Sequence, residues 1–246
     1  LGLNSDEIYH IAERLRRKLN VMRLLDFTLP ISGILAGRRL RRFLKSILGE
    51  KTFADLKIPV KIMAYDLSNR QNITVETGRL LDAVCKSIAV PGIFGPIMEN
   101  DRMIIDGGVL DPVPVDILYK CGAKKIITVN VLPGPKDIHE RNMRLKEMAK
   151  EEENMILNSS YAAGIIICVK RFFRKIFMPN IFDVIMTSMQ AMEYELAERS
   201  CAKVDISLHP VLSDATSIDF HLVKKFVKKG EDEAMLHINK IRNLVS

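Results

Sequence analysis

The segment Asp106-Gly107-Gly108 places a carboxylate directly before two glycines, which suits a base held in a tight backbone turn. A carboxylate in a partly desolvated position gains basicity and can take a proton from a hydroxyl group. Asp-Gly is also a common turn sequence, so these three residues by themselves fit a structural role better than a catalytic one. The residues on either side decide between the two interpretations.

A longer pattern surrounds this segment. The stretch Lys86-Ser87-Ile88-Ala89-Val90-Pro91-Gly92 comes before it, followed by a loop with a Phe and a short hairpin, and Asp111-Pro112-Val113-Pro114 comes after it. The string resembles the patatin-like phospholipases, in which ASIAIPG precedes DG[GA] and N-x-P follows. Asp111 stands where the family more often has Asn. The resemblance covers essentially the whole chain and is closest to the bacterial members related to neuropathy target esterase.

The resemblance implies a Ser–Asp dyad in which Asp106 is the general base and Gly107 and Gly108 form the turn beside it. The family's serine lies in a GxSxG elbow, and no His is needed because the carboxylate takes the proton itself. The implied substrates are phospholipids or related lipid esters, with no metal and no cofactor. Ile93 and Phe94 are candidates to line a cleft for the acyl chain, although core packing explains them equally well.

The sequence contains neither GxSxG nor a glycine-rich oxyanion loop. Ser32 lacks the preceding glycine, and Ser87 lies where the family has a structural residue. We therefore expect both motifs to lie before Leu1, with the first βαβ unit of roughly 30 residues cut away. The chain alone is then expected to be inactive.

Strands and helices alternate along the chain, which predicts a mostly parallel central sheet with helices on both faces. The resemblance likewise implies one three-layer α/β/α patatin-like hydrolase domain over residues 1–246, truncated at its N-terminus. Helices are predicted over 5–19, 37–48, 79–88, 113–119, 181–203, 217–228 and 231–244, with a break at Gly230. Strands are predicted over 59–65, 71–76, 103–105, 204–208 and the continuously apolar 126–132, which should be covered on both faces.

The charge balance favours an anionic partner. There are 37 basic and 30 acidic residues, a net charge of +7. Such an excess suits nucleic acid or an anionic lipid surface, and a solvated basic surface without a partner explains it equally well. The basic residues are not interleaved with aromatics as in a base-stacking platform. We therefore expect a lipid surface and no nucleic acid.

The cysteines and histidines carry no motif. The four cysteines are scattered, without a CxxC pair or a His at ligand spacing, so no zinc site is expected and the thiols should be reduced and mostly buried. Reduced thiols indicate a cytoplasmic protein. None of the five histidines has a Ser or Cys in a nucleophile context, so surface or structural roles are expected for His10, His139, His209, His221 and His237.

Residues 133–179 form a long, charged and heterogeneous segment, which we interpret as a variable insertion. Its apolar stretch 161–169 is far shorter than the roughly 20 residues that span a bilayer. Two interpretations stay open, a buried helix with a basic cap and a helix in a membrane interface. The interface is slightly favoured, because aromatic and basic side chains alternate. Its candidate membrane contacts are Lys170, Arg171, Phe172, Phe173, Arg174 and Lys175.

The preferred hypothesis is a lipid acyl hydrolase, a phospholipase or esterase, to which this chain supplies the catalytic Asp106. The alternative is a non-catalytic lipid-surface binding or regulatory module of the same fold. Under either hypothesis we expect a cytoplasmic protein that can attach peripherally to a membrane. A nucleic-acid binder is the third hypothesis and rests on charge alone. The lipid head group, the acyl position and the oligomeric state do not follow from the sequence.

Overall fold

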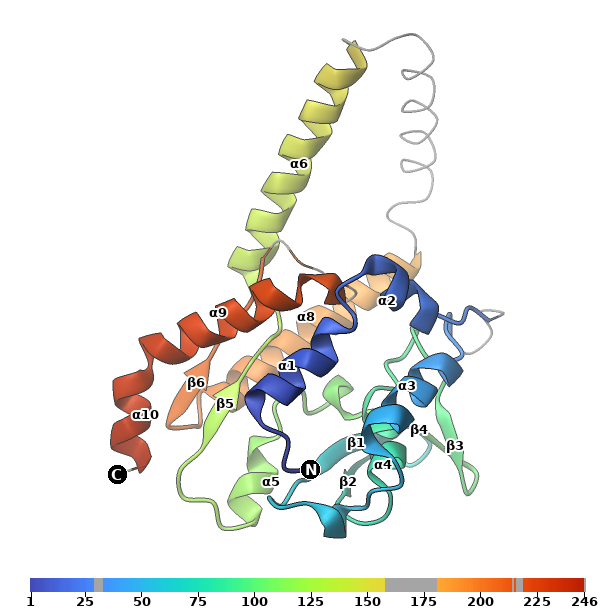
Figure 1. Cartoon of the computed structure of the whole chain (residues 1–246), viewed down its shortest axis with the longest axis vertical. Coiled ribbons are helices and arrows are strands. Elements are labelled where there is room, and N and C mark those ends of the chain that lie inside the picture. Colours follow the sequence, from blue (N-terminus) through green and yellow to red (C-terminus); the bar gives the residue numbers. More distant parts are fainter. Residues whose placement is uncertain (29–32, 158–180, 214, 216–218, 246) are drawn as a thin grey trace.

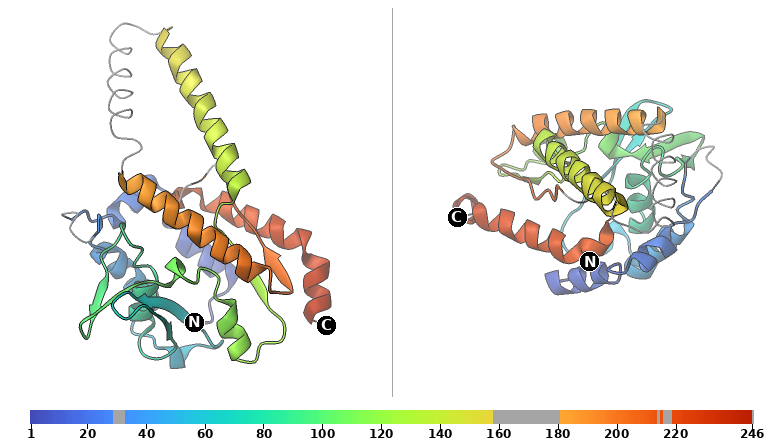
Figure 2. Two further views of the ribbon diagram at one scale, coloured as in Figure 1. Left: turned by 180° about the vertical axis from the view of Figure 1, so that it is seen from behind. Right: turned by 90° about the horizontal axis from the view of Figure 1, so that it is seen from above.

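The computed structural model describes residues 1–28, 33–157, 181–213, 215 and 219–245. These residues form two separate sheets, and the long helix α8 (Ile181–Cys201) crosses the body of the molecule behind α1 (Ser5–Glu13) (Figure 1). A second long helix, α6 (Pro135–Leu157), projects away from both sheets, as Figure 1 and the left view of Figure 2 show.

The larger sheet has four strands in the order β2-β1-β4-β3, and every neighbouring pair is antiparallel. The β1–β2 turn is held by the buried Asp66 carboxylate, which accepts hydrogen bonds from the backbone and side-chain nitrogens of Asn69 at 3.0 and 2.8 Å. The β3–β4 turn uses Asn100 and Asp101 at φ 49° and 60°. Its strands are β1 (Ile62–Asp66), β2 (Gln71–Val75), β3 (Ile97–Glu99) and β4 (Arg102–Asp106).

The smaller sheet pairs β5 (Ile127–Val129) with β6 (Ile206–Leu208) in parallel. The prediction of a mostly parallel central sheet is therefore wrong for the strands that the structure describes, while the α/β class holds. The tight turns after β1 and β3 are too short for a crossover and can join only antiparallel strands. Coverage of β5 on both faces is also wrong, because Ile127 and Val129 are 39% and 54% exposed.

Most predicted helices form, with shifted ends. The Asn4–Glu7 capping box starts α1, as the sequence indicated, but the predicted helix 5–19 is divided into α1 and α2. Gly230 does not interrupt α9, and the break falls at His237. The remaining helices are α1 (Ser5–Glu13), α2 (Lys18–Leu24), α3 (Arg38–Leu48), α4 (Leu80–Ser87), α5 (Val115–Lys120), α9 (Val223–Leu236) and α10 (Ile238–Val245), with 3-10 turns η1 (Phe53–Asp55), η2 (Gly107–Val109) and η3 (Phe220–Leu222).

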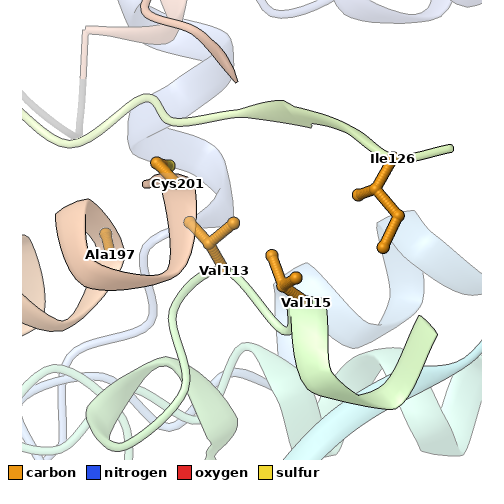
Figure 3. Close-up of a cluster of buried hydrophobic side chains, with 5 residues drawn as sticks. All are labelled: Val113, Val115, Ile126, Ala197 and Cys201. Carbon is orange, nitrogen blue, oxygen red and sulfur yellow. The ribbon is translucent and has the colours of Figure 1, made fainter. Parts of the chain in front are cut away.

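Each sheet has its own buried layer. Helix α4 packs on β1 and β4 and buries Leu81 and Ala83, and Ile104 of β4 is fully buried. The second layer joins α5, β5 and α8 through a cluster of small and branched side chains (Figure 3). That cluster comprises Val113, Val115, Ile126, Ala197 and Cys201.

Candidate functional site

Asp106 is the last residue of β4 and lies where the larger sheet passes into η2. Its position is fixed from two sides. It pairs with Ala64 of the neighbouring strand β1, and its backbone N–H donates to the carbonyl of Ala89 at 3.1 Å. The KSIAVPG stretch that carries Ala89 therefore holds the strand end in place, so the two parts of the sequence pattern meet in the fold.

The two glycines after Asp106 play different structural roles. A Cβ on Gly107 would lie 2.7 Å from the carbonyl carbon of Met63 and 2.9 Å from the nitrogen of Ala64, so only glycine fits against β1. Gly108 donates its N–H to Oδ1 of Asp106 at 2.9 Å. Neither glycine has a positive φ. Close approach of the backbone, and not left-handed geometry, requires glycine at position 107.

Burial raises the pKa of the Asp106 carboxyl above its usual value, and the hydrogen bond from Gly108 opposes this effect without cancelling it. Desolvation disfavours the ionised carboxylate. Asp106 thus has the raised proton affinity that a general base at this position needs.

A second carboxyl group, Glu193 of α8, interacts with Asp106. Burial and then the negative charge of Asp106 raise the pKa of Glu193 to about 7. No sequence motif indicates Glu193. A signal was present, because Glu193 falls on the same helical stripe as the buried residues Ala197 and Cys201, where an apolar residue is the usual choice.

The start of α8 covers the loop that precedes the hairpin. Gly92 has φ 82°, and a Cβ there would lie 2.9 Å from the ring of Phe182 and 3.0 Å from the sulfur of Met186. Ile93 accepts a backbone hydrogen bond from Leu35, and the ring of Phe94 approaches Gly37. The contact of Phe94 is one of packing, and a role of these two residues in lining an acyl cleft stays a prediction.

Asp111, in the position of the family's Asn, is half-buried and donates its backbone N–H to the carbonyl of Gly107 at 3.0 Å. Burial and the nearby charge of Asp116 raise the pKa of Asp111, while Lys203 lowers it. Three acidic residues with raised pKa values, Asp106, Asp111 and Glu193, therefore belong to the region where β4, η2 and α8 meet.

Metal-ligating side chains gather elsewhere. Among the described residues, Glu198, Cys201 and His209 form a group whose ligand atoms lie within 4.8 Å of one another. Two other histidines contact acidic residues, and the ring of His10 lies against that of Tyr9. His221 lies 3.5 Å from Asp219, and His237 contacts Glu233. No sequence motif predicts that Glu198, Cys201 and His209 lie close together.

The predicted membrane contacts, residues 170–175, lie outside the described residues. Within the part of the chain that the structure describes, we find no helix that combines the length and the apolar character needed to cross a membrane.

The part of the chain around Asp106 is similar to a known protein family. Residues 1–119 match the family model described as Patatin-like phospholipase. This match, which includes the whole Lys86–Pro114 pattern, confirms the patatin-like recognition made from the sequence. It covers the first part of the chain, and a resemblance of the remaining residues stays a prediction.

Several relatives that are similar to part of the chain carry NTE family, neuropathy target esterase or lysophospholipase names. An uncharacterized NTE family protein of Mycobacterium tuberculosis is 32% identical over 126 residues, which are 51% of this chain and 35% of that relative. The Neuropathy target esterase of Drosophila melanogaster is 27% identical over 45% of this chain and 8% of its own length. A Lysophospholipase of Meyerozyma guilliermondii is 30% identical over 53% of this chain and 9% of its own length. The match thus spans about a third, or less, of each of these relatives.

Proposed function

We propose that the protein containing this chain is a lipid acyl hydrolase, and that Asp106 is the base of a Ser–Asp dyad. The observation that carries the proposal is a half-buried carboxylate with a raised pKa, held at a strand end by the Gly108 N–H in a patatin-like sequence. The fungal relatives that bear the name lysophospholipase and the insect neuropathy target esterase support lipid esters as the substrate class.

The proposed chemistry transfers one proton at a time. Oδ1 of Asp106 accepts from Gly108, so we assign the serine proton to Oδ2. The serine oxygen attacks the ester carbonyl as its proton moves to the carboxylate, and the proton then passes to the departing alcohol. Water then attacks the acyl carbonyl as the same carboxylate takes its proton. The bond between the acyl carbon and the serine oxygen breaks to release the fatty acid, and the proton passes from the carboxylate to the serine oxygen.

The proposed dyad needs a serine in a GxSxG segment, and these 246 residues contain no such sequence, so the proposal assigns the serine to another part of the protein. The proposal therefore assigns to this chain the base and not the complete site. It also expects that the 246-residue chain by itself hydrolyses p-nitrophenyl esters and phospholipid vesicles no faster than background.

The test is the substitution Asp106→Asn in a longer form of the protein that carries a GxSxG segment. Asn keeps the shape and can still accept the Gly108 hydrogen bond, but it cannot take the serine proton. Loss of general-base catalysis should lower kcat by about 10²–10⁴-fold. The readout is steady-state hydrolysis of a lysophospholipid and of a p-nitrophenyl ester.

The matched control is Asp101→Asn, an exposed carboxylate in the β3–β4 turn whose left-handed φ suits Asn equally well. It should leave kcat unchanged, and so should His→Ala at positions 10, 139, 221 and 237. An active Asp106→Asn enzyme together with one inactive His variant would overturn the dyad.

The alternative is a non-catalytic lipid-surface binding or regulatory module of the same fold, which the missing GxSxG would support if the longer protein lacks that sequence as well. The two candidates differ in the longer protein, because the module has no turnover to lose. If Asp106→Asn and the parent protein are equally inactive while both bind lipid, the module is the better description.

We further propose that the protein is cytoplasmic and attaches to anionic membranes through Lys170, Arg171, Phe172, Phe173, Arg174 and Lys175. Each basic residue near such a surface contributes about 1 kcal/mol, and salt screens it. Binding to vesicles containing phosphatidylserine should therefore weaken as salt rises. Replacing the four basic residues by Gln should remove the salt-dependent part, and equal binding by that variant would contradict the proposal.

A further inference from the structure

A cluster of three different metal-ligating side chains lies at the end of the smaller sheet. A carboxylate oxygen of Glu198, the thiol sulfur of Cys201 and a ring nitrogen of His209 lie within 4.8 Å of one another. Glu198 and Cys201 are three residues apart in α8, which puts them on one face of the helix. His209 follows β6 directly, so two elements contribute ligands.

The backbone around the cluster is fixed by the core. Cys201 is 7% exposed and belongs to the buried layer of Figure 3. The β5–β6 pairing sets the position of His209, and its backbone N–H donates to Glu233 at 3.0 Å. The buried Asn130, which follows β5, donates from Nδ2 to Oε1 of Glu198 at 2.9 Å. The backbone positions of the three ligand residues are thus set before any ion arrives.

The imidazole of His209 is oriented in the way that metal-binding histidines are. Its Nε2 lies 3.0 Å from the hydroxyl of Ser207, and its Nδ1 lies 3.7 Å from Oε1 of Glu198. With the proton on Nε2 and donated to Ser207, the Nδ1 lone pair faces an anionic oxygen. Two acceptors that face each other beside a thiol fit a shared cation, and a hydrogen bond from the distal ring nitrogen is the usual support of a ligating His.

We propose that Glu198, Cys201 and His209 bind one Zn²⁺ ion, with water in a fourth position. Zinc takes sulfur at about 2.3 Å and nitrogen or oxygen at about 2.0–2.2 Å, so tetrahedral ligand atoms lie roughly 3.2–3.8 Å apart. The Nδ1–Oε1 distance of 3.7 Å already fits. The widest separation, 4.8 Å, must shorten by about 1 Å, which rotation of the Glu198 and His209 side chains, each 39% exposed, can supply.

The ligand chemistry selects the type of ion. A thiolate with an imidazole suits zinc, whereas magnesium and calcium prefer oxygen alone. Binding replaces the thiol proton, which passes to solvent, and the bound ion joins the end of α8 to the strand β6. This role does not depend on ester hydrolysis, since Asp106 takes no part in it.

The test uses the reduced, metal-free 246-residue chain, titrated with Zn²⁺ by calorimetry and with Co²⁺ by absorption. We expect one equivalent of either ion and a thiolate-to-cobalt charge-transfer band, and zinc should raise Tm. His209→Gln, Glu198→Gln and Cys201→Ser should each weaken zinc binding at least tenfold. Cys201 is buried, so the two variants of exposed side chains decide the question if Cys201→Ser does not fold.

Matched controls replace the same residue types outside the cluster. Cys121→Ser and His10→Gln alter exposed side chains and should leave affinity and stoichiometry unchanged. The proposal is overturned if zinc binds no tighter to the parent chain than to His209→Gln. It is also overturned if the cobalt band is missing, or if it is lost in Cys121→Ser and kept in Cys201→Ser.

Discussion

The two sheets of this molecule present their reactive side chains in different ways. At the larger sheet, Asp106 and its supporting glycines are contiguous, and the backbone of one strand presses against the next. At the smaller sheet, Glu198, Cys201 and His209 come from two elements and meet only because β6 returns beside β5. A contiguous site leaves a readable motif, whereas a site assembled by packing leaves none.

The largest effect is expected at the point of closest backbone approach. Gly107→Ala would put a methyl group 2.7 Å from the Met63 carbonyl carbon, so β4 must move away from β1. Overpacking against backbone should cost about 3 kcal/mol of unfolding free energy. Urea titration followed by circular dichroism measures it. A loss below about 1 kcal/mol would show that β4 can shift away from β1 at little cost, and that the backbone around Asp106 is not tightly constrained.

At the smaller sheet, the second largest effect is expected from a buried polar side chain. Asn130 is 1% exposed, and its side chain bonds both Glu198 and the backbone N–H of Leu132. Asn130→Ala leaves these partners unsatisfied and should cost about 2 kcal/mol in the metal-free chain. The control Asn142→Ala, exposed on α6, should change stability by less than about 0.5 kcal/mol. Equal effects of the two substitutions would show that the hydrogen bonds of the Asn130 side chain do not stabilise the smaller sheet.

Glu193 connects α8 to the Asp106 site and predicts a pH effect. Its pKa is about 7 in the fold against an ordinary value of 4.5. The folded state therefore holds this proton more tightly, and the associated stability is present below about pH 4.5 and is lost as pH rises through 7. Glu193→Gln removes this loss.

At pH 8 the Glu193→Gln variant should be more stable than the parent chain by about 1–2 kcal/mol, after allowance for solvent screening of a half-buried group. The gain should shrink toward pH 4.5. Thermal melts of both chains from pH 4 to 8 measure the difference, with Glu195→Gln, an exposed neighbour, as the control. A gain in stability that does not depend on pH would show that the Glu193 carboxyl does not have a raised pKa next to Asp106.

The smallest effect is expected at a glycine without close neighbours. Gly230 lies inside α9, and nothing lies within 4 Å of a Cβ built on it. Gly230→Ala should stabilise the protein by about 0.5–1 kcal/mol, because alanine is the better helix former. The opposite signs expected at positions 107 and 230 would separate a glycine required by packing from one that is merely tolerated.

The sequence predicted the elements well and their assembly poorly. The capping box at Asn4, the hairpin after Asp66 and the position of Asp106 at a strand end all follow from local patterns. The parallel sheet was wrong because hairpin strands were counted as if helices joined them. The sequence predicted a helix break at Gly230, but the residues on both sides continue helix α9.

The remaining parts of the sites depend on contacts between distant residues. Glu193 meets Asp106 because α8 lies against η2, and 87 positions separate the two residues in the printed sequence. His209 reaches Cys201 through strand pairing. Spacing along the chain does not report such distances, so the cluster of Glu198, Cys201 and His209 could not be predicted from it.

Helix α6 has one consequence for hydrogen exchange. Most of its described side chains are exposed, including Met143, Leu145 and Met148. A helix that gains little from tertiary packing keeps only the stability of an isolated helix, which is marginal in water even at 23 residues. Its amide protons should exchange with deuterium through local fraying, orders of magnitude faster than those of β4, whose exchange requires the larger sheet to open.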